Sequence, residues 1–113
     1  MKTIDQRTND FFISTIKLCK SLRLTPINER IVKQVVASSG SVGANFQEAS
    51  AAMSKRDFVK CLKISRKEAK ECVLWFSGLK ESDVSKKIEI DELINEAKEI
   101  TYILTSIISK AER

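Results

Sequence analysis

Five basic residues between positions 54 and 70 recur at steps of three and four residues. They are Arg56, Lys60, Lys63, Lys67 and Lys70. On an α-helix this spacing places all five within about 80° of one face. A row of cations attracts the phosphates of a nucleic acid, with an affinity that falls as the salt concentration rises. The pattern is also typical of the solvated side of an amphipathic helix, so the spacing alone leaves both interpretations open.

The same segment contains the charge excess of the chain. Residues 54–70 hold seven basic residues against Asp57 and Glu68, a net charge of +5, and the whole chain of 113 residues also has a net charge of +5. The remainder is therefore balanced. Such a concentration of positive charge indicates a partner rich in negative charge.

Polar side chains form a second row just upstream. Ser38, Ser41, Asn45 and Glu48 follow one another at steps of 3, 4 and 3, and Glu68 interrupts an apolar flank further on. We expect these groups to lie at the edge of the core and to form hydrogen bonds across helices, because buried polar groups need partners. The alternative is a ligand-binding or catalytic site, although these residue types lack an evident arrangement of nucleophile, base and orienting group.

The residue types best suited to catalysis and metal binding are scarce. The chain contains no histidine, the commonest general base and metal ligand. Its three cysteines are an odd number, and Cys61 and Cys72 lie about 16 Å apart along one predicted helix, too far for a disulfide. We interpret the cysteines as small apolar residues and expect no metal, no cofactor and no enzymatic activity.

The elements that position these residues are predicted to be helices. Gly and Pro together number only four, and apolar residues recur at three- and four-residue steps. The pattern predicts helices at about residues 3–23, 26–52, 55–79 and 91–111, with the start of the fourth at residue 91 or earlier. The second begins at Pro26 after a Thr25 cap, and the third follows a Ser54 cap. Gly78 and the polar stretch after it end the third helix.

Each predicted helix has one apolar face for the core. In chain order these faces are Ile4, Thr8, Phe11, Thr15, Leu18 and Leu22; Ile31, Val35, Val42, Phe46, Ala49 and Met53; Phe58, Leu62, Ser65, Ala69, Val73, Phe76 and Leu79; and Ile90, Leu93, Ala97, Ile100, Leu104, Ile107 and Ala111. Short connections force neighbouring helices to run in opposite directions, which predicts an all-α, antiparallel up-down-up-down four-helix bundle. The length predicts a single domain, residues 1–113.

The predicted second helix has small residues on the side away from the core. They are Ala37, Gly40, Gly43, Ala44 and Ala51. An interior Gly costs a helix about 1 kcal/mol relative to Ala, and close approach of another helix is the usual compensation. We therefore expect a contact with a second subunit and a homo-oligomer. The alternative is a solvated face that tolerates small residues.

The chain has no apolar run long enough to span a bilayer, and its first residues lack the pattern of a secretion signal. We therefore expect a cytoplasmic protein with no membrane partner.

Residues 41–79 resemble the central pattern of a bacterial four-helix-bundle family encoded in intervening sequences of 23S rRNA genes. That pattern runs S-x-x-x-N-x-x-E, then S-x-x-[DE]-F, then a helix with Ala and Glu. The matching positions are Ser41, Asn45, Glu48, Ser54, Asp57, Phe58, Ala69 and Glu71. Residues 46–49 depart from it, reading F-Q-E-A where many members have I-A-E-G. The resemblance implies a homopentameric, ring-like barrel and kinship with the accessory variability proteins of diversity-generating retroelements, basic pentamers that bind a reverse transcriptase and nucleic acid.

Two functions follow from these observations. The first is a non-enzymatic, oligomeric nucleic-acid-binding or ribonucleoprotein accessory protein whose basic row contacts the phosphates of RNA or DNA. The second is a protein-interaction scaffold whose basic face binds an acidic protein partner. An enzyme ranks third, and it would need a cleft built on Asn45, Glu48 and Glu68.

Overall fold

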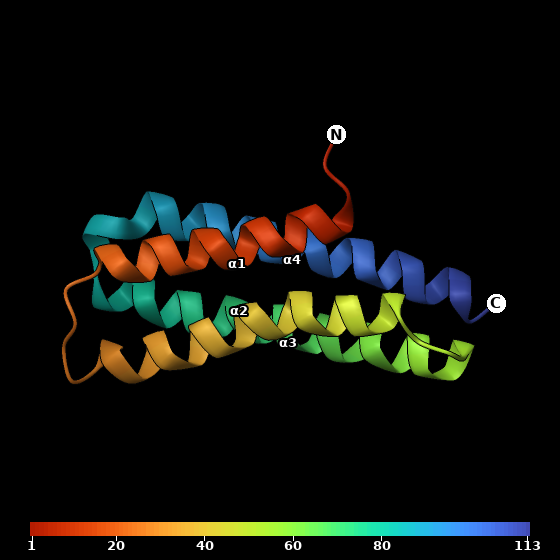
Figure 1. Cartoon of the computed structure of the whole chain (residues 1–113). Helices are drawn as coiled ribbons and strands as arrows, with labels where there is room; N and C mark the ends of the chain where they lie inside the picture. Colours follow the sequence, from red (N-terminus) through yellow and green to blue (C-terminus); the bar gives the residue numbers. More distant parts are fainter.

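The computed structural model describes residues 1–113 and contains helices and no strands. Four α-helices pack along their lengths (Figure 1). They are α1 (Ile4–Ser21), α2 (Asn28–Ser50), α3 (Lys55–Ser82) and α4 (Lys87–Ala111), with a short 3-10 helix, η1 (Val84–Lys86), before α4. The prediction of an all-α protein of four helices is confirmed.

The molecule is elongated and measures 45 × 26 × 18 Å. Helix α1 lies beside α2 and α4, and α3 also lies beside α2 and α4. The α1–α2 loop and the α3–α4 turn are at one end of the molecule, whereas the α2–α3 turn is at the other end, near the C-terminus (Figure 1). None of the four helices is both long and apolar enough to cross a membrane.

The core lies between the four helices, where 18 buried apolar residues form one cluster. The rings of Phe11 and Phe76 meet edge to face inside it, with centroids 6.1 Å apart, so α1 and α3 touch across the centre. Most residues of the predicted apolar faces are buried or pack against this cluster. Met53 is the clear exception and is 97% exposed, because α2 ends at Ser50.

Helix α2 follows a hydrogen-bonded turn that starts at Thr25. The Thr25 hydroxyl accepts from the N–H of Asn28 at 3.2 Å, and the Asn28 side chain accepts from the N–H of Thr25 at 2.7 Å. The N–H of Glu29 donates to the Thr25 carbonyl at 3.0 Å. Thr25 therefore caps this turn as expected, although the regular helix starts two residues after Pro26.

Helix α3 begins at the predicted cap, because the Ser54 hydroxyl accepts from the N–H of Asp57 at 3.1 Å. The prediction that Gly78 ends the helix is wrong, since α3 continues to Ser82. A Cβ atom at position 78 would come within 3.2 Å of Cδ1 of Ile31 on α2. The glycine therefore permits close packing of α3 on α2 rather than ending the helix.

Helix α4 begins at Lys87, which agrees with the prediction of a start at about Asp91 or earlier, and the polar stretch before it is mostly ordered as helix. The Asp83 side chain accepts from the N–H of Ser85 at 3.1 Å and so stabilises η1. An ion pair of 2.9 Å between Lys80 and Asp91 then joins the end of α3 to the start of α4.

Candidate nucleic-acid interface

Helix α3 displays the predicted basic row on its solvent side. Arg56, Lys60, Lys63, Lys67 and Lys70 are all exposed. On the opposite side of the helix, Leu62, Ala69 and Phe76 are completely buried in the core. The apolar face thus fixes the rotation of α3, and that rotation directs the five cations outward.

A groove of about 720 Å³ runs along the first half of this face, and we call it the basic groove. It is lined by Lys55, Arg56, Val59, Lys60, Lys63, Ile64, Lys67 and Glu112. Four of the five predicted residues line it, and Lys70 follows at the next turn of α3. Lys55 adds a cation that the spacing of three and four residues did not include. Its position next to Arg56 in the sequence could have indicated that it belongs to the same surface. The groove therefore combines five cations with a single carboxylate.

Glu112 brings that carboxylate from the end of α4. Its Oε2 lies 3.1 Å from Nζ of Lys63, and both side chains are about half exposed. Exposed pairs of this kind contribute less than about 1 kcal/mol to stability. Arg56, Lys60 and Lys67 form no ion pair within the chain. Most of the positive charge of the groove is therefore available to a partner.

Arg66 of α3 is a partly exposed cation at the contact with α4. Nη1 of Arg66 donates to Oγ1 of Thr105 at 3.4 Å across the two helices. Tyr102, one turn earlier on α4, is 78% exposed. Sequence spacing assigned no role to either residue, because Arg66 falls outside the basic row and Tyr102 belongs to another helix.

The predicted polar row of α2 divides into buried and exposed members. Ser38 is buried, Ser41 and Asn45 are partly buried, and Glu48 is exposed. The Asn45 side chain donates to the Ser41 carbonyl of its own helix at 2.9 Å. The prediction of hydrogen bonds across helices is therefore wrong for Asn45, whose own backbone offers a nearer acceptor, and Glu48 is open to solvent.

Glu68 of α3 lies beside this row. Burial raises the pKa of its carboxyl group, and the neighbouring Glu71 raises it further, whereas the Ser38 hydroxyl and the charge of Lys67 partly offset the rise. Glu68 of α3 and Ser38 of α2 therefore lie close together at the edge of the core, where the sequence pattern places both residues.

A buried hydrogen bond joins the same two helices one layer deeper. The Ser65 hydroxyl donates to the Val42 carbonyl at 2.7 Å, and both residues are completely buried. The periodicity correctly placed Ser65 on the core face. It gave no sign that the hydroxyl had an acceptor on another helix, because that depends on how closely α2 and α3 approach.

The two glycines of α2 face α1 rather than solvent. A Cβ atom at Gly40 would lie 3.2 Å from Cε1 of Phe12, and one at Gly43 would lie 3.6 Å from Oγ1 of Thr8. The prediction that both belong to an outward face is wrong, because the close approach that they permit is to α1 of the same chain. The other three members of the predicted face, Ala37, Ala44 and Ala51, are exposed.

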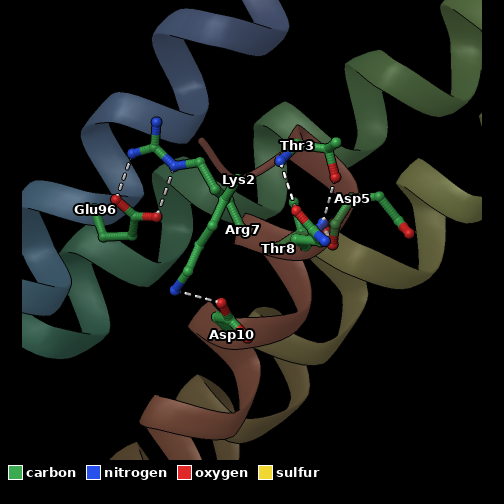
Figure 2. Close-up of polar contacts among 8 residues, drawn as sticks. Lys2, Thr3, Asp5, Arg7, Thr8, Asp10 and Glu96 are labelled. Carbon is green, nitrogen blue, oxygen red and sulfur yellow. Dashed lines mark hydrogen bonds and ion pairs between the residues drawn. The ribbon is translucent and has the colours of Figure 1, made fainter.

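A second groove, of about 840 Å³, lies between α1 and α4. Arg7 crosses it and donates to Glu96 from Nε at 3.0 Å and from Nη2 at 2.6 Å, as Figure 2 shows. Nη2 also donates to Glu99 at 2.7 Å. The Glu96 hydrogen bond and, to a smaller extent, Glu99 raise the pKa of Arg7 against the effect of burial. With Lys2 paired to Asp10 at 2.6 Å, much of the charge in this groove is paired within the chain (Figure 2).

The cysteines occupy apolar surroundings. Cys72 is buried, and Cys19 and Cys61 are partly buried. Burial raises the pKa of the Cys72 thiol to about 12, with a further contribution from nearby carboxylates, and raises that of Cys19 to about 11. Both thiols are therefore protonated at neutral pH, where they are weak nucleophiles.

The helices and the basic groove define the class of protein, a small four-helix bundle with one strongly basic side. The chain belongs to the 23S rRNA-intervening sequence protein family, whose model matches residues 3–106. The match includes the whole of α1, α2 and α3 and most of α4. The family resemblance read from the central pattern is confirmed.

The chain is also similar to a solved structure. This is the crystal structure of a protein of unknown function from the S23 ribosomal protein family of Bacteroides thetaiotaomicron. The TM-score is 0.82 at 31% sequence identity, and the similarity covers 94% of this chain and 95% of that chain. The two proteins therefore share the fold over nearly their full lengths. No curated protein matches the chain significantly.

Proposed function

We propose that this chain is a non-enzymatic, oligomeric nucleic-acid-binding or ribonucleoprotein accessory protein. The basic groove of α3, with five cations and one carboxylate, is the observation that supports the proposal. Phosphate contacts from Arg56, Lys60, Lys63, Lys67 and Lys70 would supply the affinity. Binding would then be largely independent of base sequence and would weaken as salt rises, because each phosphate contact releases counterions.

The proposal includes an antiparallel order of the helices. The connections at alternating ends of the molecule support it (Figure 1). The contacts of Ser65 with Val42 and of Gly78 with Ile31 also support it, because the residue numbers rise along α3 as they fall along α2.

The proposal also includes assembly into a ring-like homo-oligomer. Ala37, Ala44 and Ala51 are exposed and would contact a second subunit, and a pentamer is the assembly that the resemblance implies. Repetition of the basic groove around a ring would strengthen binding to a long polyanion through multivalency.

Fluorescence anisotropy with labelled RNA and DNA oligonucleotides at low salt tests the phosphate-binding role. Changing all five residues of the basic row to Gln should weaken binding by at least about tenfold. The slope of log K against log salt should fall by about one for each phosphate that the variant no longer neutralises. A control variant removes five exposed basic residues elsewhere, namely Lys17, Lys20, Arg23, Lys33 and Lys87.

The control removes the same amount of charge, so it separates the position of the charge from its total. Equal loss of binding in both variants contradicts the proposed interface, as does a wild-type protein that binds neither RNA nor DNA at low salt. Circular dichroism and sedimentation velocity establish that both variants remain folded and keep the wild-type assembly.

A second candidate function is a scaffold whose basic face binds an acidic protein. The pairing of Glu112 with Lys63 favours this function, because it shows that a protein carboxylate can bind a cation of the groove. If the kinship with retroelement accessory proteins that the resemblance implies holds, a reverse transcriptase would be one such partner. A pull-down from nuclease-treated lysate distinguishes the two functions, since a protein partner should remain bound to the wild type and be absent from the five-residue variant.

A further inference from the structure

Tyr102 is the only exposed aromatic residue of the chain. Its side chain is on the solvent face of α4 and is 78% exposed. The five phenylalanines and the tryptophan are all buried or partly buried. Burial of an aromatic ring is favourable by about 2–3 kcal/mol. An exposed ring on a rigid helix therefore offers a surface on which another planar group can stack.

The register of α3 against α4 places Tyr102 at the same level along the bundle as Lys70, the last residue of the basic row. Three contacts set this register, namely Lys63 with Glu112, Arg66 with Thr105 and Lys80 with Asp91. Along this series the α4 numbers fall as the α3 numbers rise. One helical turn beyond Arg66 is Lys70, and one turn before Thr105 is Tyr102, so these two exposed residues are at the same level.

A shallow hollow of about 300 Å³ adjoins Tyr102. Tyr102 borders it together with Arg7, Lys98, Glu99 and Ile103. A nucleic-acid strand that runs along the basic groove and on to Lys70 therefore reaches the level of an exposed ring that borders open space.

We propose that Tyr102 stacks against an unpaired base of a single-stranded RNA or DNA whose phosphates lie along the basic groove. The inference rests on the proposed function and specifies its ligand as single-stranded. Single-strand binders combine a positive groove for the backbone with aromatic rings for the bases. In a duplex the faces of the bases are covered by their neighbours, so Tyr102 would add little to duplex binding.

Anisotropy with single-stranded and duplex oligonucleotides of equal phosphate number tests this assignment. For the single strand, Tyr102→Ala should weaken binding by about 5- to 100-fold, the effect of one stacked base, and Tyr102→Phe should keep wild-type affinity. The salt slope should not change, because the same phosphates remain bound. Ile88→Ala is the matched control, since Ile88 is a similarly exposed apolar residue of α4.

An oligonucleotide with abasic sites in every position isolates the stacking interaction. Wild-type protein should bind it as weakly as Tyr102→Ala binds the intact strand. The same measurements with RNA and with DNA oligonucleotides show whether the 2′-hydroxyl adds to binding. If Tyr102 stacks on a base, Tyr102→Ala must lower the affinity for at least one of the two.

Two results overturn the assignment in different ways. If Tyr102→Ala binds single strands as tightly as the wild type does, while the five-residue basic variant loses binding, the phosphate role stands and stacking is wrong. Both proposals fail if the wild type binds no nucleic acid at low salt. They also fail if the wild type binds duplex and single strand equally and if neither Tyr102→Ala nor the five-residue variant changes the affinity.

Discussion

At the level of single residues, Glu68 is an acid whose surroundings oppose its charge. Burial and Glu71 raise the pKa of its carboxyl group above the ordinary value of 4.5. A raised pKa in the folded state favours the protonated form, so ionisation of Glu68 lowers stability as pH rises through the folded-state pKa. Glu68→Gln should therefore raise the free energy of unfolding at pH 7 by a few tenths of a kcal/mol, because the site is partly open to solvent.

Urea unfolding as a function of pH measures this effect. The advantage of Glu68→Gln should shrink as pH falls and should vanish below about pH 4.5, where the wild-type carboxyl is protonated in both states. Glu81→Gln, at an exposed position of the same helix, should show no such pH-dependent gain. A stability difference that stays constant from pH 7 to pH 4 would contradict this account of Glu68.

The glycines of α2 differ in the room available to a methyl group. At Gly43 an added Cβ would make ordinary contacts with Thr8, whereas at Gly40 it would press on the ring of Phe12 at 3.2 Å. Gly43→Ala should therefore raise the free energy of unfolding by about 1 kcal/mol, the helix-propensity difference. Gly40→Ala should gain less, because the ring must move.

Thermal and urea unfolding of the two variants measure this difference, and sedimentation velocity should find their assembly state unchanged. If Gly43→Ala dissociates an oligomer, Gly43 faces a second subunit and the packing of α2 on α1 does not explain the glycine.

At the level of elements, α1 buries the fewest apolar residues of the four helices. Two of its four buried residues are threonines, whereas all seven buried residues of α4 are apolar. Its side toward α4 is a groove bridged by Arg7. We therefore expect α1 to open first, and its amides to exchange with deuterium faster than those of α3 or α4.

Arg7→Gln removes the bridge and should lower the free energy of unfolding by about 1–2 kcal/mol, because Arg7 and Glu96 are only about one quarter exposed. Hydrogen exchange should accelerate in α1 more than in α3. The exposed pair of Lys2 with Asp10 supplies the control, and Lys2→Gln should change stability by less than about 0.5 kcal/mol. Equal acceleration in all four helices would show that α1 is not an independent unit.

The elements were largely predictable from the sequence because helix type and core face depend on local periodicity. The caps at Thr25 and Ser54 were recognised for the same reason, as each bonds a residue three positions away. The sequence alone indicates a helix end at Gly78, because the actual role of this glycine depends on Ile31, a residue of another helix. The sequence did not fix the start of α4 more closely than about Asp91 or earlier, because polar residues give no apolar period to follow.

The candidate site was predictable only where it lies on one helix. Spacing along α3 identified the basic row, since five residues of one helix share a face whatever the rest of the fold does. The contribution of Glu112 and the position of Tyr102 level with Lys70 depend on the register of α4 against α3. The hydrogen bond from Ser65 to Val42 likewise depends on the packing of two helices.

At the level of the whole molecule, the exposed alanines of α2 provide a direct test of assembly. If Ala37 and Ala44 contact a second subunit, a carboxylate there would be placed in a tightly packed interface without a partner, at a cost of several kcal/mol, roughly. The double variant Ala37→Glu and Ala44→Glu should therefore sediment as a monomer at concentrations where the wild type is an oligomer.

Circular dichroism should show the same helix content in both proteins, because both alanines are exposed within the chain. Asn95→Glu, at an exposed position of α4, should assemble like the wild type and excludes a general effect of added negative charge. The monomeric variant keeps its basic groove, so its affinity for a short oligonucleotide should match that of one wild-type subunit. Its affinity for a long strand should fall much more, because multivalency is removed. An oligomer that survives both substitutions would place the subunit contact on another face of the bundle, and a wild type that sediments as a monomer would remove assembly from the proposed function.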